Sequence, residues 1–439
     1  MKANNNKTKK PILKESNDFD FSSLLIPYCN NSQIELFKSN LNNKPLSGLI
    51  LNKKKISKKK LINQFPFLIE DKDDDLILQY DNENQISKSL LNFTGCFYLL
   101  DISSAIISYY IEKYIPKNSL VLDMASAPGG KSISLSFRRD DLLFISNDIS
   151  IKRQFETNKN ICRLGLDNIL TISIDPLKLN NNKIYDVIIL DTPCSGSGMI
   201  RKDIDIKNDY STKKVDNLLQ IQKELLNKAD NLLKDGGYII YSTCSLSIKE
   251  DENQIETFLN EHDYEEIDLN MKDKTIIKGI NNHGYHLIPG IYKGEGIYFT
   301  LLKKKGHLNI NHREINIYDK KEDLNIFKYK KNNYVVSKMY EEVSSLNFLM
   351  PGLKIYNDEE YKKCDFDYAY SKVNKTIKKI ELSKEDAIKL ISFNEIKINS
   401  KNEDLVIFTY LNNPICFGKI IDNKVKNYLP KGLKSNLIY

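Results

Sequence analysis

The chain lacks several features that mark common protein classes. Among its 439 residues, no apolar run approaches the roughly 20 residues needed to cross a membrane. The first ten residues are rich in Asn and Lys and contain no apolar core, so we expect no secretory signal there. These absences favour a soluble, cytoplasmic protein with no membrane partner.

Paired cysteine motifs are also missing. The seven cysteines form no C-x-x-C pair, and the five histidines do not complete a zinc-binding pattern. An odd number of cysteines in a chain of this size argues against a disulfide framework, and reduced thiols fit the cytosol. We therefore expect no metal, and a cysteine that stands out is either structural or catalytic.

The charge is mildly positive but unevenly spread. There are 65 basic and 58 acidic residues, and the net charge is +7. Six lysines lie within Lys53–Lys60, and four more lie within Lys7–Lys14. Such clusters suit a polyanion such as RNA, but the general abundance of Lys, Asn and Ile gives the same pattern through composition alone.

The length allows two or three domains, and the apolar fraction of 41% is enough to build sizeable cores. The pattern along the chain divides it into five segments. We expect a flexible N-terminus over 1–20, a small α/β domain over 21–115, an α/β core over 116–305, a linker over 306–334 and a compact separate domain over 335–439.

Short apolar strands alternate with helices in the central segment. Alternation of this kind predicts a mostly parallel, doubly wound sheet, in which ligands bind beyond the carboxyl ends of the strands. Five side chains are expected at such strand ends: Asp123, Asp148, Asp175, Asp191 and Cys244. Their common position indicates a single site.

A glycine-containing loop follows the first of these strands and opens a helix. It consists of Ala125, Ser126, Ala127, Pro128, Gly129, Gly130 and Lys131. The pattern is close to the phosphate-binding loop of NTPases, with Ala125 in place of the first glycine, and Asp191 imitates the magnesium-holding aspartate of that fold. Asp148 at the second strand end favours a nucleoside cofactor instead, because an acid there accepts hydrogen bonds from ribose hydroxyls.

Two cysteines lie just past predicted strand ends. Cys194 is in the segment Asp191–Gly198, and Cys244 is in Tyr241–Ser245. A lone cysteine is usually a small buried apolar residue, but two of them at the ligand edge of one sheet favour a chemical role.

These motifs together resemble a known family. The segments VLDMASAPGGKS, NDIS, LDTPCSGSGMIRKD and YSTCSLSIKEDEN are similar to successive motifs of the Sun family of RNA cytosine-5 methyltransferases. The resemblance continues over Thr94–Ser104 and Pro289–Phe299. The stretch Val425–Lys434 resembles the C-terminal signature of the bacterial RsmF group, which methylates 16S ribosomal RNA.

The resemblance implies a fold and a set of domains. It predicts a Rossmann-like methyltransferase core with a mostly parallel seven-stranded sheet over 116–305. It also predicts an N-terminal RNA-binding α/β domain and a C-terminal PUA-like RNA-binding domain. The implied cofactor is S-adenosylmethionine, the implied partner is 16S rRNA or the small ribosomal subunit, and a monomer is favoured.

Residue roles follow from the same resemblance. Cys244 is the nucleophile, Cys194 assists product release, and Asp191 supports the cytosine ring. Cofactor contacts are expected from Ala125–Lys131, Asp148, Arg153, Asp175 and Asp191. Three alternatives stay open: the same chemistry on tRNA, an RNA-binding NTPase, and a non-catalytic RNA-binding protein that kept the fold.

Overall fold

The computed structural model describes residues 19–81, 84–315, 325–355 and 377–429. Residues 1–18 of the N-terminus that we expected to be flexible, which include the lysines of 7–14, lie outside these ranges, as do the last five residues of the C-terminal signature, 430–434. No helix in the described residues combines the length and the apolar character needed to cross a membrane.

The N-terminal region is a small antiparallel sheet with short helices, as expected for a small α/β unit. The sheet has the order β2-β3-β1-β4. Its elements are η1 (Phe21–Leu25), α1 (Asn31–Asn40), β1 (Ser47–Leu51), α2 (Lys58–Gln64), β2 (Ile69–Glu70), β3 (Ile77–Tyr80), η2 (Ile86–Lys88), α3 (Leu90–Phe93), β4 (Phe97–Leu99) and α4 (Ile102–Ile111).

Part of the 53–60 lysine run serves contacts within the chain. The Lys55 ammonium donates to the carbonyl oxygens of Thr94 at 2.7 Å and Arg163 at 2.6 Å. Lys58 pairs with both Glu70 and Asp75 at 2.8 Å. The N-terminal sheet is therefore fastened to the neighbouring core through lysines that sequence reasoning considered for RNA.

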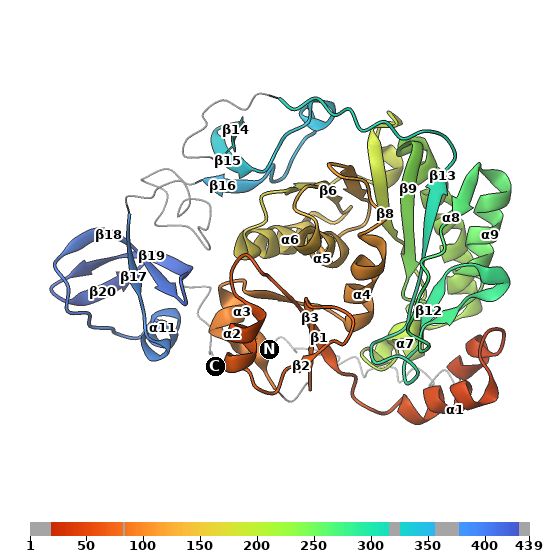
Figure 1. The fold of residues 1–439 in the computed structure, drawn as a ribbon, viewed down its shortest axis with the longest axis horizontal. Helices are drawn as coiled ribbons and strands as arrows, with labels where there is room; N and C mark the ends of the chain where they lie inside the picture. Colours follow the sequence, from red (N-terminus) through yellow and green to blue (C-terminus); the bar gives the residue numbers. More distant parts are fainter. Residues whose placement is uncertain (1–18, 82–83, 316–324, 356–376, 430–439) are drawn as a thin grey trace, which may run out of the picture.

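The core is a Rossmann-like sheet with parallel strands in the order β7-β6-β5-β8-β9, followed by antiparallel β13. Helices cover both faces, so the central strands are buried, and their sequences are largely continuous apolar runs. Figure 1 shows α4, α5 and α6 on one side of the sheet and α8 and α9 on the other. The elements are β5 (Leu120–Asp123), α5 (Gly130–Arg138), β6 (Leu143–Asn147), α6 (Ile151–Leu164), β7 (Ile169–Ile172), η3 (Pro176–Lys178), β8 (Tyr185–Asp191), η4 (Ser197–Met199), α7 (Ile204–Asp209), α8 (Thr212–Leu232), β9 (Leu233–Thr243), α9 (Glu252–Glu261) and β13 (Ile297–Lys304).

The described part of this sheet has nine strands, whereas we expected seven. The difference arises at its antiparallel end. β13 is long enough to pair with β12 (Tyr285–Leu287) along its first half and with β10 (Tyr264–Glu266) along its second half. β11 (Ile277–Lys278) then forms a short hairpin with β12, with η5 (Ile280–Asn282) at the turn.

The segment expected as a linker over 306–334 contains regular structure. It includes β14 (Asn325–Tyr329) and the start of β15 (Asn332–Val336), which form a three-stranded sheet with β16 (Leu353–Ile355). The 3-10 helix η6 (Glu341–Val343) lies within the connection between β15 and β16. Sequence reasoning missed β14 because this short strand lies within a stretch, 307–333, that is rich in Lys and Asn.

The C-terminal region is a third small sheet, in the order β17-β18-β19-β20, with one helix. Figure 1 shows it at one side of the molecule, beside the N-terminal helices α2 and α3. The Asn413 side chain donates to the Lys55 carbonyl oxygen at 3.2 Å, which links the two regions. The elements are β17 (Lys378–Glu381), α11 (Lys384–Ile391), β18 (Glu403–Tyr410), β19 (Asn413–Ile421) and β20 (Lys424–Asn427).

Candidate active site

Four parallel strands bring most of the expected site residues to one edge of the sheet. The loop 125–131 follows β5, and Asp148 follows β6. Asp191 is the last residue of β8, and Cys244 comes directly after β9. Because the strands are parallel and adjacent, these features lie side by side although up to 119 positions separate them in the sequence.

The loop 125–131 makes a tight turn into α5. Gly129 is the N-cap of this helix and has a φ of +99°, a left-handed conformation that favours glycine. A Cβ added to Gly130 would come within 3.0 Å of the Leu100 side chain. Ser126 is buried and hydrogen-bonds to Ser146 at 2.6 Å, so the loop is held against β6.

Asp148 is joined to the loop by direct contacts. Its carboxylate accepts hydrogen bonds from the backbone N–H of Ala127 at 3.2 Å and of Ser150 at 2.8 Å. Arg153 lies 3.4 Å from the same carboxylate and also donates to the Ala127 carbonyl oxygen. Arg153 therefore connects two of the expected cofactor-binding elements.

Asp191 links the loop to the two cysteine-bearing strands. One carboxylate oxygen lies 2.6 Å from the Lys131 ammonium, and the other accepts a hydrogen bond from the Ser242 hydroxyl at 2.8 Å. A cavity of about 250 Å³ opens here, and Asp123, Asp191 and Lys131 contribute to its lining. The remaining lining residues come from the loop, from β4 and from the segment after β4: Ala125, Ser126, Ala127, Pro128, Gly130, Tyr98, Leu99, Leu100, Asp101 and Ser104.

Asp123 is a buried acid in the wall of this cavity. The Ser132 hydroxyl donates to one of its oxygens, while the other oxygen, Oδ1, has no protein partner. Burial disfavours the charged form and raises the pKa of Asp123 to about 7, although Ser132 and Lys131 oppose the shift. The site therefore contains a carboxyl group that changes charge near neutral pH.

Asp175 does not lie directly at a strand end, which corrects our expectation. β7 ends at Ile172, and Asp175 caps the 3-10 helix η3 by accepting a hydrogen bond from Leu177 N at 3.1 Å. The strand stops early because Ile174 instead pairs with the Asn147 side chain, through two bonds of 2.9 Å. These bonds nevertheless bring the Asp175 loop beside the loop that carries Asp148.

Two exposed aliphatic side chains flank these acids, and sequence reasoning missed them. Ile149 is 66% exposed next to Asp148, and Leu177 is 43% exposed two residues after Asp175. Together they leave apolar surface beside the Asp148 and Asp175 loops. The signal that identifies them is their exposure, which the sequence does not contain.

The two cysteines face each other at the other end of this edge. The Sγ atoms of Cys194 and Cys244 lie 3.0 Å apart, and the Cys244 backbone N–H donates to the Cys194 sulfur at 3.3 Å. The hydrogen bond with Cys244 and burial both raise the pKa of Cys194 well above its ordinary value. Cys194 therefore holds its proton to a higher pH than an ordinary cysteine, and either sulfur can donate in the contact between them.

Glu250 braces both cysteine loops from behind. Its carboxylate is fully buried and accepts hydrogen bonds from Ser195 N at 2.8 Å and from the Ser245 hydroxyl at 2.7 Å. Gln222 donates to the same carboxylate at 3.2 Å and to the Pro193 carbonyl oxygen at 2.9 Å. One side chain thus fixes the residue after each cysteine.

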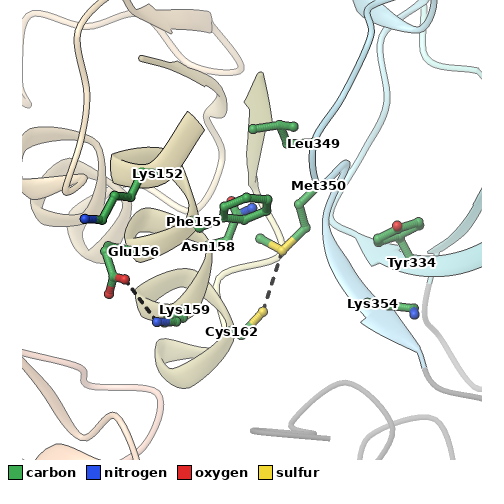
Figure 2. A pocket seen from close by; sticks show the side chains of 10 residues that line it. All are labelled: Lys152, Phe155, Glu156, Asn158, Lys159, Cys162, Tyr334, Leu349, Met350 and Lys354. Atoms are coloured by element: carbon green, nitrogen blue, oxygen red, sulfur yellow. Dashed lines mark hydrogen bonds and ion pairs between the residues drawn. The ribbon is translucent and has the colours of Figure 1, made fainter. Parts of the chain in front are cut away.

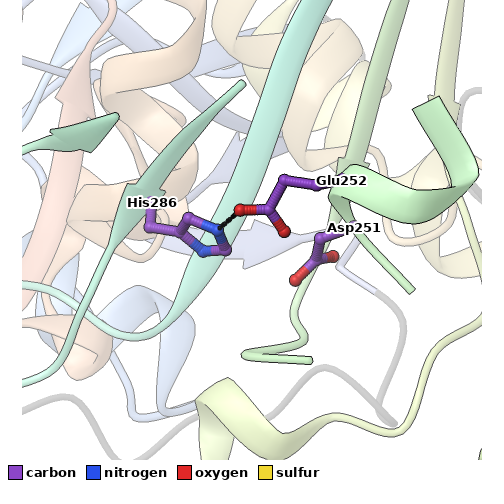
Figure 3. Close-up of side chains that lie close together, drawn as sticks. All are labelled: Asp251, Glu252 and His286. Carbon is purple, nitrogen blue, oxygen red and sulfur yellow. Dashed lines mark hydrogen bonds and ion pairs between the residues drawn. The ribbon is translucent and has the colours of Figure 1, made fainter. Parts of the chain in front are cut away.

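A second buried cluster lies behind Thr243, the residue before Cys244. Asp251 accepts a hydrogen bond from the Thr243 hydroxyl at 2.5 Å, and Glu252 accepts one from His286 at 2.9 Å. Figure 3 shows the two carboxylates turned toward each other, with His286 entering from β12. Burial raises the pKa of Asp251 well above its ordinary value. Sequence reasoning did not single out this cluster, although these are metal-ligating residue types.

Two protein-family models match the chain. Residues 114–303 match the model described as 16S rRNA methyltransferase RsmB/F, and residues 377–434 match the methyltransferase RsmF PUA domain. The first match covers the sheet edge and both cysteines. The second covers the four-stranded C-terminal sheet.

Curated relatives point the same way. A ribosomal RNA small subunit methyltransferase F from Shewanella piezotolerans is 32% identical over 238 residues, which is 52% of this chain and 50% of that protein. The chain therefore spans about half the length of this relative. A protein of the same name from Shewanella woodyi is 26% identical over 396 residues, which is 80% of this chain and 82% of that protein.

Solved structures share the fold. The crystal structure of NSun6 from Pyrococcus horikoshii with SFG has a TM-score of 0.59 at 18% identity and covers 65% of this chain and 98% of that chain. A methyltransferase homologue from the same organism has a TM-score of 0.55 at 24% identity and covers 65% and 94%.

Proposed function

The chain belongs to the RsmB/F family of 16S rRNA methyltransferases, and we propose that it transfers a methyl group from S-adenosylmethionine to C5 of a cytosine in 16S rRNA. The observation that carries this proposal is the pair of thiols, Cys194 and Cys244, held 3.0 Å apart on the sheet edge that bears the cofactor cavity. Methyl transfer to an oxygen or an exocyclic nitrogen does not require a nucleophilic thiol, whereas transfer to C5 does.

The carbon atom C5 of cytosine is a poor nucleophile, and a thiolate removes this difficulty. The Cys244 thiolate adds to C6, and the electron pair of the C5–C6 bond moves onto C5, which then accepts the methyl group. The C5 proton is next removed, the C5–C6 double bond forms again, and the Cys244 sulfur leaves with its electron pair. This is covalent catalysis, in which one difficult step is replaced by easier ones.

The geometry supports different roles for the two thiols. Either sulfur can donate in the 3.0 Å contact, and because the pKa of Cys194 is raised, we propose that Cys194 stays a thiol and donates to the sulfur of Cys244. Cys244 is therefore assigned as the nucleophile and Cys194 as the group that assists its release. Asp191, fixed by Lys131 and Ser242, is assigned to hold the N3–N4 edge of the cytosine.

The donor set around the cavity fits S-adenosylmethionine, which supplies an electrophilic methyl group on a positively charged sulfur. Asp148 is suited to the ribose hydroxyls, and the backbone of 125–131 to the carboxylate at a helix N-terminus. Ile149 and Leu177 offer apolar surface to the adenine beside Asp175. The unpartnered Oδ1 of Asp123 is a buried acceptor suited to a cationic or N–H group.

The NTPase alternative fits this cavity less well. A phosphate-binding loop needs its lysine for the phosphates, but Lys131 is held by Asp191 at 2.6 Å. A triphosphate would also face Asp101 and Asp123 in the cavity lining. Calorimetry with S-adenosylmethionine and with ATP or GTP plus magnesium separates the two: we expect binding of S-adenosylmethionine alone.

The rRNA assignment is tested by mapping 5-methylcytosine in a deletion strain. Bisulfite sequencing of 16S rRNA and of the tRNA pool should show one lost 16S position and unchanged tRNA. A gene encoding the wild-type chain should restore the position, and one encoding Cys244→Ala should not. Loss of tRNA methylation with intact 16S rRNA would contradict the rRNA assignment and favour the tRNA alternative.

The non-catalytic alternative is tested with purified protein. A single turnover on small ribosomal subunits from the deletion strain should transfer one methyl group per subunit. Since both thiols and the cofactor carboxylates come from one chain, we propose that the protein acts as a monomer in the cytoplasm. We expect full activity at protein concentrations where only the monomer is detected, which would support the monomeric state.

A further inference from the structure

A second and larger hollow lies away from the thiols, between α6 and the β14–β16 sheet. Its volume is about 570 Å³, more than twice that of the cofactor cavity. Figure 2 shows Lys152, Phe155 and Lys159 on the helix side and Tyr334, Met350 and Lys354 on the other. We call this hollow the α6 groove.

The two walls of the α6 groove are held together by the backbone. Thr171 of β7 donates to the Met350 carbonyl oxygen at 2.8 Å and accepts from Leu349 N at 2.8 Å. Ser337 N donates to the Asp167 carbonyl oxygen at 2.8 Å. The groove is therefore a fixed feature of the core and not a gap between independent parts.

The groove combines an exposed aromatic ring with apolar surface. Phe155 is 51% exposed although it lies in the middle of α6. Figure 2 shows its ring directed toward Met350 and Leu349 from the opposite wall. A ring left in water beside a hollow of this size is suited to stacking with a flat, partly apolar ligand such as a nucleobase.

The charge around the groove is positive. Glu156, the carboxylate among its lining residues, is paired with Lys159 at 3.0 Å, and the lysines 152 and 354 also line it. The nearby β14–β15 hairpin carries three exposed lysines at 328, 330 and 331. This combination of lysines and an exposed ring is complementary to the phosphates and bases of RNA.

The wall formed by β15 and β16 lies between the two family matches. The methyltransferase match ends at residue 303, and the PUA match begins at residue 377. One wall of the groove therefore lies outside both family matches. Its other wall, α6, begins directly after the Asp148 loop. An RNA segment in the groove would thus pass close to the cofactor-binding edge.

We propose that the α6 groove binds an unpaired nucleotide of the RNA substrate, with the base stacked on Phe155 and a neighbouring phosphate on Lys152. This inference rests on the proposed function in so far as RNA is the substrate. It adds a contact site outside the active site and outside the C-terminal sheet.

The test is RNA binding by the full-length protein, measured with a fluorescein-labelled single-stranded RNA of mixed sequence and no base pairing. Phe155→Ala should weaken binding by roughly 5- to 100-fold, the range found when a base-stacking aromatic is removed. Phe155→Tyr should bind within about twofold of wild type, because it keeps the ring. Lys152→Gln should lower the slope of log K against log salt by about 0.7.

Ile151→Ala is the matched control, because Ile151 is 53% exposed on the same helix but is not among the residues that line the groove. It should bind like wild type, and every variant should keep its affinity for S-adenosylmethionine. Unchanged RNA affinity in Phe155→Ala would overturn the proposal and leave the groove to a protein partner. Equal losses in Phe155→Ala and Phe155→Tyr would also overturn it.

These outcomes separate the groove from the proposed activity. Suppose that wild type binds RNA and the Phe155 variants behave as expected, but no methyl transfer is found. The proposed activity is then contradicted, and RNA binding in the α6 groove is supported. If methyl transfer is found but Phe155→Ala binds RNA like wild type, the proposed activity is supported and RNA binding in the α6 groove is contradicted.

Discussion

The cofactor cavity and the thiol pair lie on the same sheet edge but are built in different ways. The carboxylates in and beside the cavity each make a few separate contacts, as Asp148 does with Ala127, Ser150 and Arg153. The thiols are held by a continuous buried polar network centred on Glu250. The first arrangement leaves acceptors available to a small molecule, whereas the second fixes two sulfur atoms.

This difference has a functional consequence. A cofactor that binds and leaves in every cycle needs acceptors that exchange partners easily. The proposed nucleophile and its proposed assistant must instead be held close to each other, and their sulfur atoms lie 3.0 Å apart. Changes on the thiol side should therefore affect the rate of methyl transfer, and changes on the cofactor side should affect cofactor affinity.

The largest effect is expected from Cys244→Ala. Removal of the nucleophile should reduce methyl transfer to background, because the uncatalysed attack of C5 is negligible. The affinity for S-adenosylmethionine should stay within about twofold of wild type, since the thiol contacts the base. Radiolabelled methyl transfer and calorimetry measure the two quantities, and normal turnover would contradict the assignment.

Glu250→Ala should give the next largest effect. Loss of the brace leaves Ser195 N–H and the Ser245 hydroxyl without their acceptor, and we expect roughly 100-fold slower turnover and about 3 kcal/mol lower stability. Glu250→Gln should recover most of both. Its amide oxygen can accept from Ser195, and its amide N–H can donate to Ser245.

The Glu250 prediction distinguishes positioning from simple folding through kcat and KM. We expect kcat to fall and the KM for S-adenosylmethionine to remain near wild type. A fall in kcat accompanied by an equally large rise in this KM, with no recovery in Glu250→Gln, would contradict the idea that the thiol side controls rate and the cofactor side controls affinity.

Asp148→Ala tests the cofactor half. Loss of this buried acceptor should weaken S-adenosylmethionine binding by about 1–3 kcal/mol, while kcat at saturating cofactor stays close to wild type. Asp148→Asn is the matched control, because it keeps the acceptor oxygen but removes the charge that faces Arg153. Unchanged affinity in both variants would show that the second strand end does not bind the ribose.

The last prediction concerns the dependence of stability on pH through Asp123. Burial raises its pKa from 3.8 to about 7, so between these values the folded chain holds a proton that the unfolded chain has lost. Asp123 should therefore make the protein less stable as pH rises from 4 to 7, by up to about 1.4 kcal/mol per pH unit. Urea unfolding of Asp123→Asn should show a flatter dependence than wild type over this window, and parallel curves would contradict the shift.

The sequence predicted elements whose ends carry local signals. α6 and α11 show such signals, because Ser150 and Ser383 cap their first turns and Gly165 ends α6 with a left-handed φ of +74°. The strand ends predicted at Asp123 and Asp191 are confirmed. They could be predicted because each of these buried parallel strands is a short apolar run that ends at a polar residue.

The sequence did not predict the supporting structure behind the thiols. The stretch that contains Glu250, Asp251 and Glu252 is as polar as a solvated loop, yet these three side chains are buried. Their partners, such as Gln222 and His286, come from distant parts of the chain. Burial of a polar group depends on partners that only the fold brings together, so composition alone could not reveal this network.

Covalent trapping in Cys194→Ala tests the central assignment most directly. With its assistant removed, Cys244 should remain bonded to C6 after methylation, and cells expressing the variant should contain a protein–RNA species that survives denaturation. The species should disappear in Cys194→Ala/Cys244→Ala, and sequencing of its RNA should identify a 16S position. A species that persists in the double variant, or that forms only in Cys244→Ala, would contradict the assignment of Cys244 as the nucleophile.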